Sequence, residues 1–219
     1  MQHTKKRIWD LPIRLTHWGL VFSFFGAFFT SELNPLIIHE TFAFACLTLV
    51  LFRVFWGLLG SDTARFTQFV TGIAPIKSYL SELKQLRHKE FWGHNPVGAL
   101  AVIAILSLMI TLVSAGLFAR EASFYGPWAA SVSRSTSELL KDTHEVLANW
   151  LMVIVVVHII AILAYRFVLK DNLIKPMITG VRPTDSDTAE PRFAPLWLAG
   201  VLFALSIIIT GALFRYWLF

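Results

Sequence analysis

The sequence has a single cysteine in 219 residues, Cys46, and this cysteine lies in an apolar stretch where we expect it to be a small core residue. One thiol cannot form a disulfide framework, a CxxC motif or a thiolate metal site. Charged residues are also scarce, at 15% of the chain, whereas hydrophobic residues make up 56% and the mean hydropathy is +0.63. Ordinary soluble domains do not have this composition, which therefore predicts an integral membrane protein.

Clustered histidine motifs are missing as well. The sequence contains no HxxxH or HxxHH box, the pattern expected of a membrane di-iron oxidase. Copper would also call for methionine or cysteine ligands. The chain shows no internal repeat and no low-complexity tract. These absences leave the isolated histidines to be explained by another chemistry.

Five apolar segments are long enough to cross a membrane, since about 20 residues span the roughly 30 Å of hydrocarbon. They are Leu15–Ser31, Ile37–Leu59, Asn95–Ala119, Val146–Tyr165 and Phe193–Phe214. The first follows a basic start that resembles a signal peptide, but no cleavage site of small residues follows it, so we expect it to be retained. The sequence predicts an all-α membrane protein with five transmembrane helices.

The basic residues predict the orientation of these spans. Of the 19 lysines and arginines, Arg53 lies within a span, and placing the N-terminus inside leaves 14 inside and four outside. The four are Arg120, Arg134, Lys141 and Arg215. The positive-inside rule therefore predicts a cytoplasmic N-terminus and a periplasmic C-terminus. It also accounts for the net charge of +5 without nucleic-acid binding.

The segments between the spans have distinct characters. Ser61–His94 carries apolar residues at helical spacing among charged ones, which predicts an amphipathic helix along the cytoplasmic interface. Arg120–Thr143 is predicted as an outer loop. We expect residues 1–180 to form a core with four transmembrane helices, 181–192 a polar linker and 193–219 an additional C-terminal helix.

Four of the seven histidines lie at matched depths in the predicted spans. With the N-terminus inside, His17 lies at the inner end of the first span and His39 at the outer end of the second. In the fourth span, His144 lies near the outer edge and His158 about 21 Å deeper, on the same helix face. The sequence therefore predicts an outer pair, His39 with His144, and an inner pair, His17 with His158.

Paired imidazoles from different helices suit a six-coordinate b-type haem, which needs two axial ligands from the protein. Two pairs predict two haems, about 20 Å apart, that would carry an electron across most of the membrane. A single histidine near a span end is more often an interfacial residue, but the agreement of two pairs in depth favours haem ligands. Candidates for small residues that make room for a macrocycle are Gly19, Gly26, Ala27, Ala43, Gly98, Ala101 and Ala148.

Two further residues are candidates for cofactor contacts on the inner side. Arg53 follows His39 by fourteen residues, so it shares its helix face at the depth of the inner pair. A cation there needs a carboxylate such as a haem propionate; alternatively, Arg53 extends towards the inner headgroups. His94 precedes the helix-starting Asn95-Pro96 and is a candidate propionate partner or quinone contact, or else an interfacial residue.

Several motifs resemble the bacterial cytochrome b561 family. His144-Glu145-Val146-Leu147-Ala148-Asn149, His158, Tyr165-Arg166-Phe167 and Lys170-Asp171-Asn172 resemble its last core helix. Other motifs are similar to the branch that includes the cytochrome b subunits of membrane-bound nickel–iron hydrogenases. They are Trp9-Asp10-Leu11-Pro12-Ile13-Arg14-Leu15-Thr16-His17-Trp18, His39-Glu40-Thr41, Arg53-Val54-Phe55-Trp56-Gly57, Ala64-Arg65-Phe66 and Gly93-His94-Asn95-Pro96-Val97-Gly98. The resemblance covers roughly residues 8 to 180.

The resemblance implies a four-helix transmembrane haem-binding bundle with two b haems and the same four histidine ligands. Family members pass electrons between the quinone pool and a partner redox protein, and some four-helix members oxidise superoxide and reduce quinone. Lys141 matches a lysine in those members and would attract superoxide or hydrogen-bond a quinone carbonyl; alternatively, it is an ordinary loop lysine. The fifth span has no histidine and departs from the four-helix pattern.

We therefore expect a dihaem b-type cytochrome of the bacterial cytoplasmic membrane. It would relay electrons between a quinone and a redox partner, either a c-type cytochrome or a hydrogenase-like or other redox subunit. The haems would supply the redox chemistry, and the chain their spacing and environment. One alternative is an enzyme, a superoxide–quinone oxidoreductase. Another is a haem-free scaffold or transporter subunit, which would show no Soret band.

Overall fold

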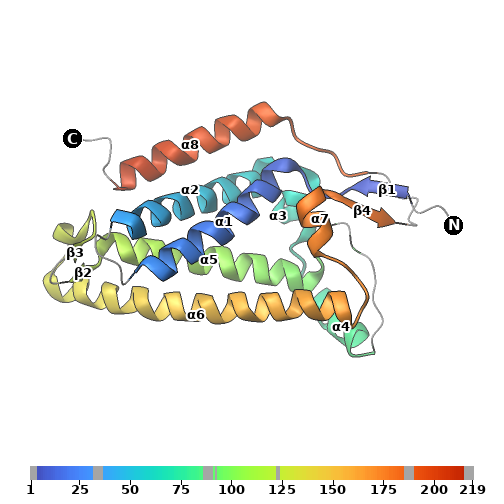
Figure 1. The fold of residues 1–219 in the computed structure, drawn as a ribbon, viewed down its shortest axis with the longest axis horizontal. Helices are drawn as coiled ribbons and strands as arrows, with labels where there is room; N and C mark the ends of the chain where they lie inside the picture. The colour runs from blue at the N-terminus through green and yellow to red at the C-terminus, as the bar shows by residue number, and fades with distance from the viewer. Residues whose placement is uncertain are drawn as a thin grey trace. The chain divides into compact units, whose positions relative to one another are not determined.

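The computed structural model describes residues 4–31, 37–85, 91, 93–121, 124–184 and 190–214. The chain is mainly helical, and its elements follow one another as Figure 1 shows. They are β1 (Thr4–Arg7), α1 (Leu11–Thr30), α2 (Ile37–Leu59), α3 (Phe66–Phe69), α4 (Ile73–Lys84), α5 (Pro96–Phe118), β2 (Arg120–Glu121), β3 (Phe124–Tyr125), α6 (Arg134–Phe167), α7 (Ile174–Thr179), β4 (Val181–Thr184) and α8 (Leu196–Phe214). Two short 3-10 turns, Asp62–Ala64 and Ala129–Ser131, complete the order.

Within the described residues, four helices are long and apolar enough to cross a membrane: α2, α5, α6 and α8. The prediction of an all-α membrane protein is therefore confirmed. The predicted first span corresponds to α1, a helix of 20 residues whose first two turns contain Arg14 and His17. A helix of this length reaches about 30 Å. Its crossing of the membrane, and the orientation of the chain, stay predictions.

The starts of α1 and α5 follow from local capping. Asp10 accepts a hydrogen bond from the Ile13 amide at 2.7 Å, which satisfies one of the exposed amides at the start of α1. Asn95 does the same for the Gly98 amide at 2.7 Å, directly before Pro96 opens α5. Asp10 also accepts a hydrogen bond from the Trp56 indole at 2.9 Å, so this buried carboxylate connects the start of α1 to the end of α2.

Contacts divide the chain into two compact units. Unit 1 comprises residues 1–15, 53–104 and 156–200, and unit 2 comprises residues 16–52, 105–155 and 201–219. Unit 1 contains the antiparallel ribbon of β1 and β4, with Lys6 opposite Arg182 (Figure 1). Arg182 donates to Asp171 at 2.7 Å, and both side chains are nearly buried. The ion pair and the ribbon hold the segment after α7 against the start of the chain.

The segment predicted as a polar linker, residues 181–192, is attached at both ends. Its first four residues form β4, and residues 185–189 lie outside the described part of the chain. After them, the Arg192 amide donates to Asp62 at 2.9 Å and the Ala194 amide donates to Ser61 at 3.0 Å. The described parts of this segment therefore pack onto unit 1, and the proposed domain limits at 180 and 192 stay a prediction.

In unit 2, residues 201–214 of α8 pack on α2. The Phe44 and Phe214 rings lie 5.5 Å apart and the Phe52 and Phe203 rings 5.9 Å apart, which shows that the two helices run antiparallel here. Phe214 joins a core cluster with Leu47, Val113 and Leu117. Residues 201–214 of the extra helix are therefore part of the core of unit 2.

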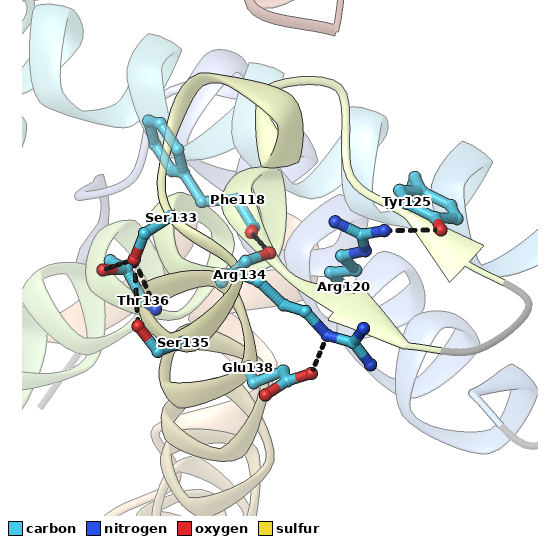
Figure 2. Close-up of polar contacts among 9 residues, drawn as sticks. Phe118, Arg120, Tyr125, Ser133, Arg134, Ser135, Thr136 and Glu138 are labelled. Carbon is cyan, nitrogen blue, oxygen red and sulfur yellow. Dashed lines mark hydrogen bonds and ion pairs between the residues drawn. The ribbon is translucent and has the colours of Figure 1, made fainter.

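Helix α6 begins at Arg134, where the sequence predicts a loop as far as Thr143. The loop prediction was wrong for these residues because hydropathy detects only the apolar part of a helix. Ser133 accepts a hydrogen bond from the Thr136 amide at 3.2 Å and so caps the helix. Arg134 pairs with Glu138 one turn later, at 2.8 Å (Figure 2). These local interactions extend the helix beyond the predicted span.

Candidate functional site

The structure brings His39 of α2 and His144 of α6 together in unit 2. Their ring centroids are 6.1 Å apart and their planes make an angle of 77°. A metal–imidazole bond is about 2 Å long and the centroid lies about 1 Å behind the nitrogen, so two rings on one metal have centroids about 6 Å apart. The observed separation fits the two axial ligands of a haem iron.

Each of these histidines has its other nitrogen fixed by a backbone carbonyl. His39 Nδ1 lies 2.8 Å from the Ala27 oxygen on α1, and His144 Nδ1 lies 2.8 Å from the Leu112 oxygen on α5. A carbonyl oxygen only accepts hydrogen bonds, so each Nδ1 must carry the proton. The neutral ring then keeps its lone pair on Nε2, the atom that binds a metal. Both side chains are therefore in the tautomer that haem ligation requires.

Gly116 provides the space for the His144 ring. A Cβ atom at Gly116 would lie 2.9 Å from both Cε1 and Nδ1 of His144, closer than van der Waals contact permits. Only glycine allows the ring to lie against α5 and reach the Leu112 carbonyl. Gly116 does not stand out in the sequence, because α5 carries no histidine that would draw attention to it. Leu112 and Gly116 lie one helical turn apart on α5, so both face His144. This spacing becomes informative only when the position of His144 beside α5 is known.

The loop before α6 and the start of α6 hold His144 in register with α5. Ser137 donates to the Phe118 carbonyl at 2.6 Å, and Figure 2 shows this contact beside the Arg134 and Glu138 pair. On the opposite side of the loop, Arg120 donates to the Tyr125 hydroxyl at 2.9 Å. Ser137 is fully buried. Since it lies two turns before His144 on the same helix, its bond to α5 fixes the height of the histidine.

Two glycines that the sequence suggests as gaps for a macrocycle have protein neighbours instead. A Cβ at Gly19 would meet the Leu49 side chain, and a Cβ at Gly26 would meet the Phe42 ring. Both neighbours lie on α2, in unit 2. These glycines therefore allow α1 and α2 to pack closely, a common role of small residues in membrane helices.

The two histidines predicted as the inner pair lie in different units. His17 lies in the part of α1 that belongs to unit 2, and His158 lies in the part of α6 that belongs to unit 1. Both are partly buried. The pairing of His17 with His158 stays a prediction from the sequence.

Arg53 lies inside unit 1 and is 7% exposed. Its Nη1 donates to the Ala64 carbonyl at 3.2 Å. Its guanidinium carbon lies 5.1 Å from the centroid of the Phe66 ring and 6.0 Å from that of the Phe69 ring. A side chain in this position does not extend to solvent or headgroups, which argues against the alternative that Arg53 is an interfacial residue.

His94 shares an aromatic neighbour with Arg53. Its ring centroid lies 4.4 Å from Phe69 and 4.8 Å from Trp9. Gly93, with φ of +91°, gives the chain the left-handed turn that brings His94 to these rings. In unit 1 the structure therefore gathers Arg53, His94 and three aromatic residues into one cluster.

Lys141 is surrounded by carboxylates. Its Nζ lies 2.8 Å from Glu145, 3.8 Å from Glu121 and 3.9 Å from Asp142. It also lines a cleft of about 440 Å³ whose other walls are Arg120, Glu121, Tyr125, Arg134, Glu138 and Asp142. The lining of the cleft thus contains three cations and three carboxylates, and Lys141 is paired within it. A role for Lys141 in attracting superoxide or in binding a quinone stays a prediction.

A buried tyrosine pair in unit 1 was not expected from the sequence. The hydroxyls of Tyr79 on α4 and Tyr165 on α6 are hydrogen-bonded, and Asn95 donates to Tyr165 at 3.1 Å. Tyr79 is 2% exposed. Burial, and then the hydrogen bond with Tyr165, raise the pKa of Tyr79. The segment predicted as amphipathic thus contains the helix α4, and this polar cluster attaches α4 to α6 and to the residue before α5. The position of α4 at the cytoplasmic interface stays a prediction.

No group of three or more histidine, cysteine or acidic side chains within the described residues could hold a metal ion. Metal binding through protein ligands alone therefore has no site there, whereas two histidines suffice for an iron held by a porphyrin. Facing histidines on separate helices of a membrane protein are the arrangement expected of the haem-binding membrane cytochromes.

The comparison with protein families also indicates a haem-binding membrane cytochrome. The model of the family described as prokaryotic cytochrome b561 matches residues 8–180, so the chain belongs to that family. The family binds b-type haem, and the chain is a membrane b-type cytochrome in electron transfer. The match ends before α8. The searches of curated proteins and of solved structures found no match.

Proposed function

We propose that the chain is a dihaem cytochrome that relays electrons across the cytoplasmic membrane between the quinone pool and a redox partner protein. The outer haem would be held by His39 and His144, and the inner haem by His17 and His158. The N-terminus would lie in the cytoplasm and the C-terminus in the periplasm, with residues 1–180 forming the haem core. The partner would be a c-type cytochrome or a membrane-bound redox subunit such as that of a hydrogenase.

The observation that supports this proposal best is the geometry of His39 and His144. Their centroid separation of 6.1 Å leaves room for a metal between them. Both rings have Nδ1 on a backbone carbonyl, so neither ring can turn without losing a hydrogen bond. Such fixed rings are characteristic of metal-binding histidines.

Each part of the chain has a separate task in this proposal. The haem iron, when bound, changes oxidation state and supplies the electron transfer. The histidines hold it at a fixed depth, while the Ala27 and Leu112 carbonyls raise the basicity of the outer rings and so favour the oxidised iron. The helices exclude water, which leaves the iron in a low-dielectric environment.

Single histidine substitutions test the assignment. In the full-length protein, His39→Ala and His144→Ala should each remove the same haem, and His17→Ala and His158→Ala should each remove the other. Haem content per chain and reduced-minus-oxidised spectra distinguish the two haems. Loss of the same haem from His17→Ala and His39→Ala would contradict the proposed pairing.

A further inference from the structure

Arg53 is a buried cation, and one of its guanidinium nitrogens makes no hydrogen bond to the residues that the structure describes. Its Nη1 donates to the Ala64 carbonyl, but its Nη2 is buried and has no hydrogen-bond partner among the residues that the structure describes. A buried charged donor without an acceptor costs several kcal/mol, and a cation within a span is tolerated only when it is paired. The environment of Nη2 therefore calls for an acceptor that the described chain does not provide.

The carboxylate that interacts with Arg53 is already engaged in two hydrogen bonds. Asp10 interacts electrostatically with Arg53. However, one of its oxygens accepts from the Ile13 amide at 2.7 Å and the other from the Trp56 indole at 2.9 Å. Asp10 thus serves the start of α1 and its connection to α2. It balances part of the charge of Arg53 without bonding to Nη2.

The surroundings of Nη2 are shaped to keep water out. Phe66 and Phe69 lie beside the guanidinium. Phe66 can lie against α2 because residue 57 is glycine, and a Cβ there would overlap the Phe66 ring. An aromatic cover over a charged group strengthens its attraction for an anion, because the local dielectric is low.

The spacing in the sequence predicts that this cation lies at the depth of His158. Fourteen residues separate His39 from Arg53 on α2, and fourteen separate His144 from His158 on α6. His39 faces His144. Since both helices are predicted to run from the outside to the inside, equal rises predict equal depths for Arg53 and His158. A lipid phosphate would lie at the membrane surface, whereas a haem propionate projects from the cofactor itself.

We propose that Arg53 binds an oxyanion through Nη2 and that this oxyanion is a propionate of the inner haem. Arg53 thereby fixes the orientation of the haem and raises its midpoint potential, because a nearby positive charge favours the reduced iron. This inference rests on the proposed dihaem function. It adds Arg53 as a residue that contacts the propionate of the haem, whereas the histidines bind the iron.

The first test compares Arg53→Gln with the matched control Arg166→Gln in the purified full-length protein. Arg166 is an exposed arginine in the last turn of α6 in the same unit. Arg53→Gln should weaken binding of one haem roughly ten- to hundredfold, or lower the midpoint potential of that haem alone. Arg166→Gln should leave both haems unchanged. Wild-type haem content and potentials in Arg53→Gln would overturn the proposal.

A second measurement identifies the anion. The wild-type chain and Arg53→Gln are each reconstituted with protohaem and with its propionate dimethyl ester. If Arg53 binds a propionate, the ester weakens haem binding by a larger factor in the wild type than in Arg53→Gln, because only the wild type loses the ion pair. Equal effects of the ester in both chains would point to a lipid phosphate or free anion and overturn the assignment. Failure of the dihaem function itself would be seen separately, in the haem count of the wild-type protein.

Discussion

Gly116→Ala is the substitution for which the structure gives the clearest expectation. The new methyl group would lie 2.9 Å from Cε1 and Nδ1 of His144. Ordinary contact needs about 3.5 Å, so the ring must move by about 0.6 Å, enough to break the hydrogen bond between His144 Nδ1 and the Leu112 carbonyl. Loss of such a supporting bond typically weakens metal binding ten- to hundredfold, or about 1.4 to 2.7 kcal/mol.

Helix propensity alone predicts that Gly116→Ala stabilises α5. Alanine is favoured over glycine in a helix interior by about 1 kcal/mol, so Gly116→Ala should not weaken α5 itself. Gly200→Ala is the matched control, because Gly200 also lies in a long apolar helix and has no atom within 4 Å of its added Cβ. The assay is titration of haem into the haem-depleted protein, followed by its absorption spectrum. Equal haem affinity in Gly116→Ala, Gly200→Ala and the wild type would refute the role of Gly116.

Three further predictions concern the supporting structure. Asp171→Asn should destabilise the protein to thermal unfolding by about 3 kcal/mol, because it leaves Arg182 buried without its carboxylate; adding Arg182→Met should recover much of the loss. Because the pKa of Tyr79 is raised, its contribution to stability is complete below about pH 10, the pKa of an unfolded tyrosine, and is lost as the pH rises further. Unfolding measured across that range should therefore show a smaller loss in Tyr79→Phe than in the wild type. Trp128→Phe removes a 2.6 Å hydrogen bond to the Leu213 carbonyl, so amide exchange at the end of α8 should accelerate while the haem spectrum stays unchanged.

The apolar helices were predictable from the sequence because hydropathy marks them directly. The predicted span Ile37–Leu59 coincides with α2, and the predicted third span differs from α5 by one residue at each end. Helix α6 is longer at its start than its predicted span, since most of residues 134–145 are polar. The signals for that extension were local: the capping Ser133 and the pairs Arg134 with Glu138 and Lys141 with Glu145.

Some features of the candidate site could be predicted from the sequence, and others could not. The meeting of His39 with His144 could be predicted, because depth in a membrane follows from position in a span. The position of Gly116 against His144 could not, since it depends on which helix packs beside α6. The burial of Arg53 depends on residues 61–69, which fold back over the end of α2. No hydrophobic periodicity in the sequence predicts this turn. Spacing along one helix is therefore visible in a sequence, whereas contacts between helices require the fold.

The central claim is that four histidines hold two b haems in one chain. A pyridine haemochrome assay on the purified full-length protein, combined with its reduced-minus-oxidised spectrum, measures this directly. The account predicts two moles of b haem per mole of protein, both reducible. One haem per chain would contradict one of the two histidine pairs, and the absence of haem would contradict the account as a whole.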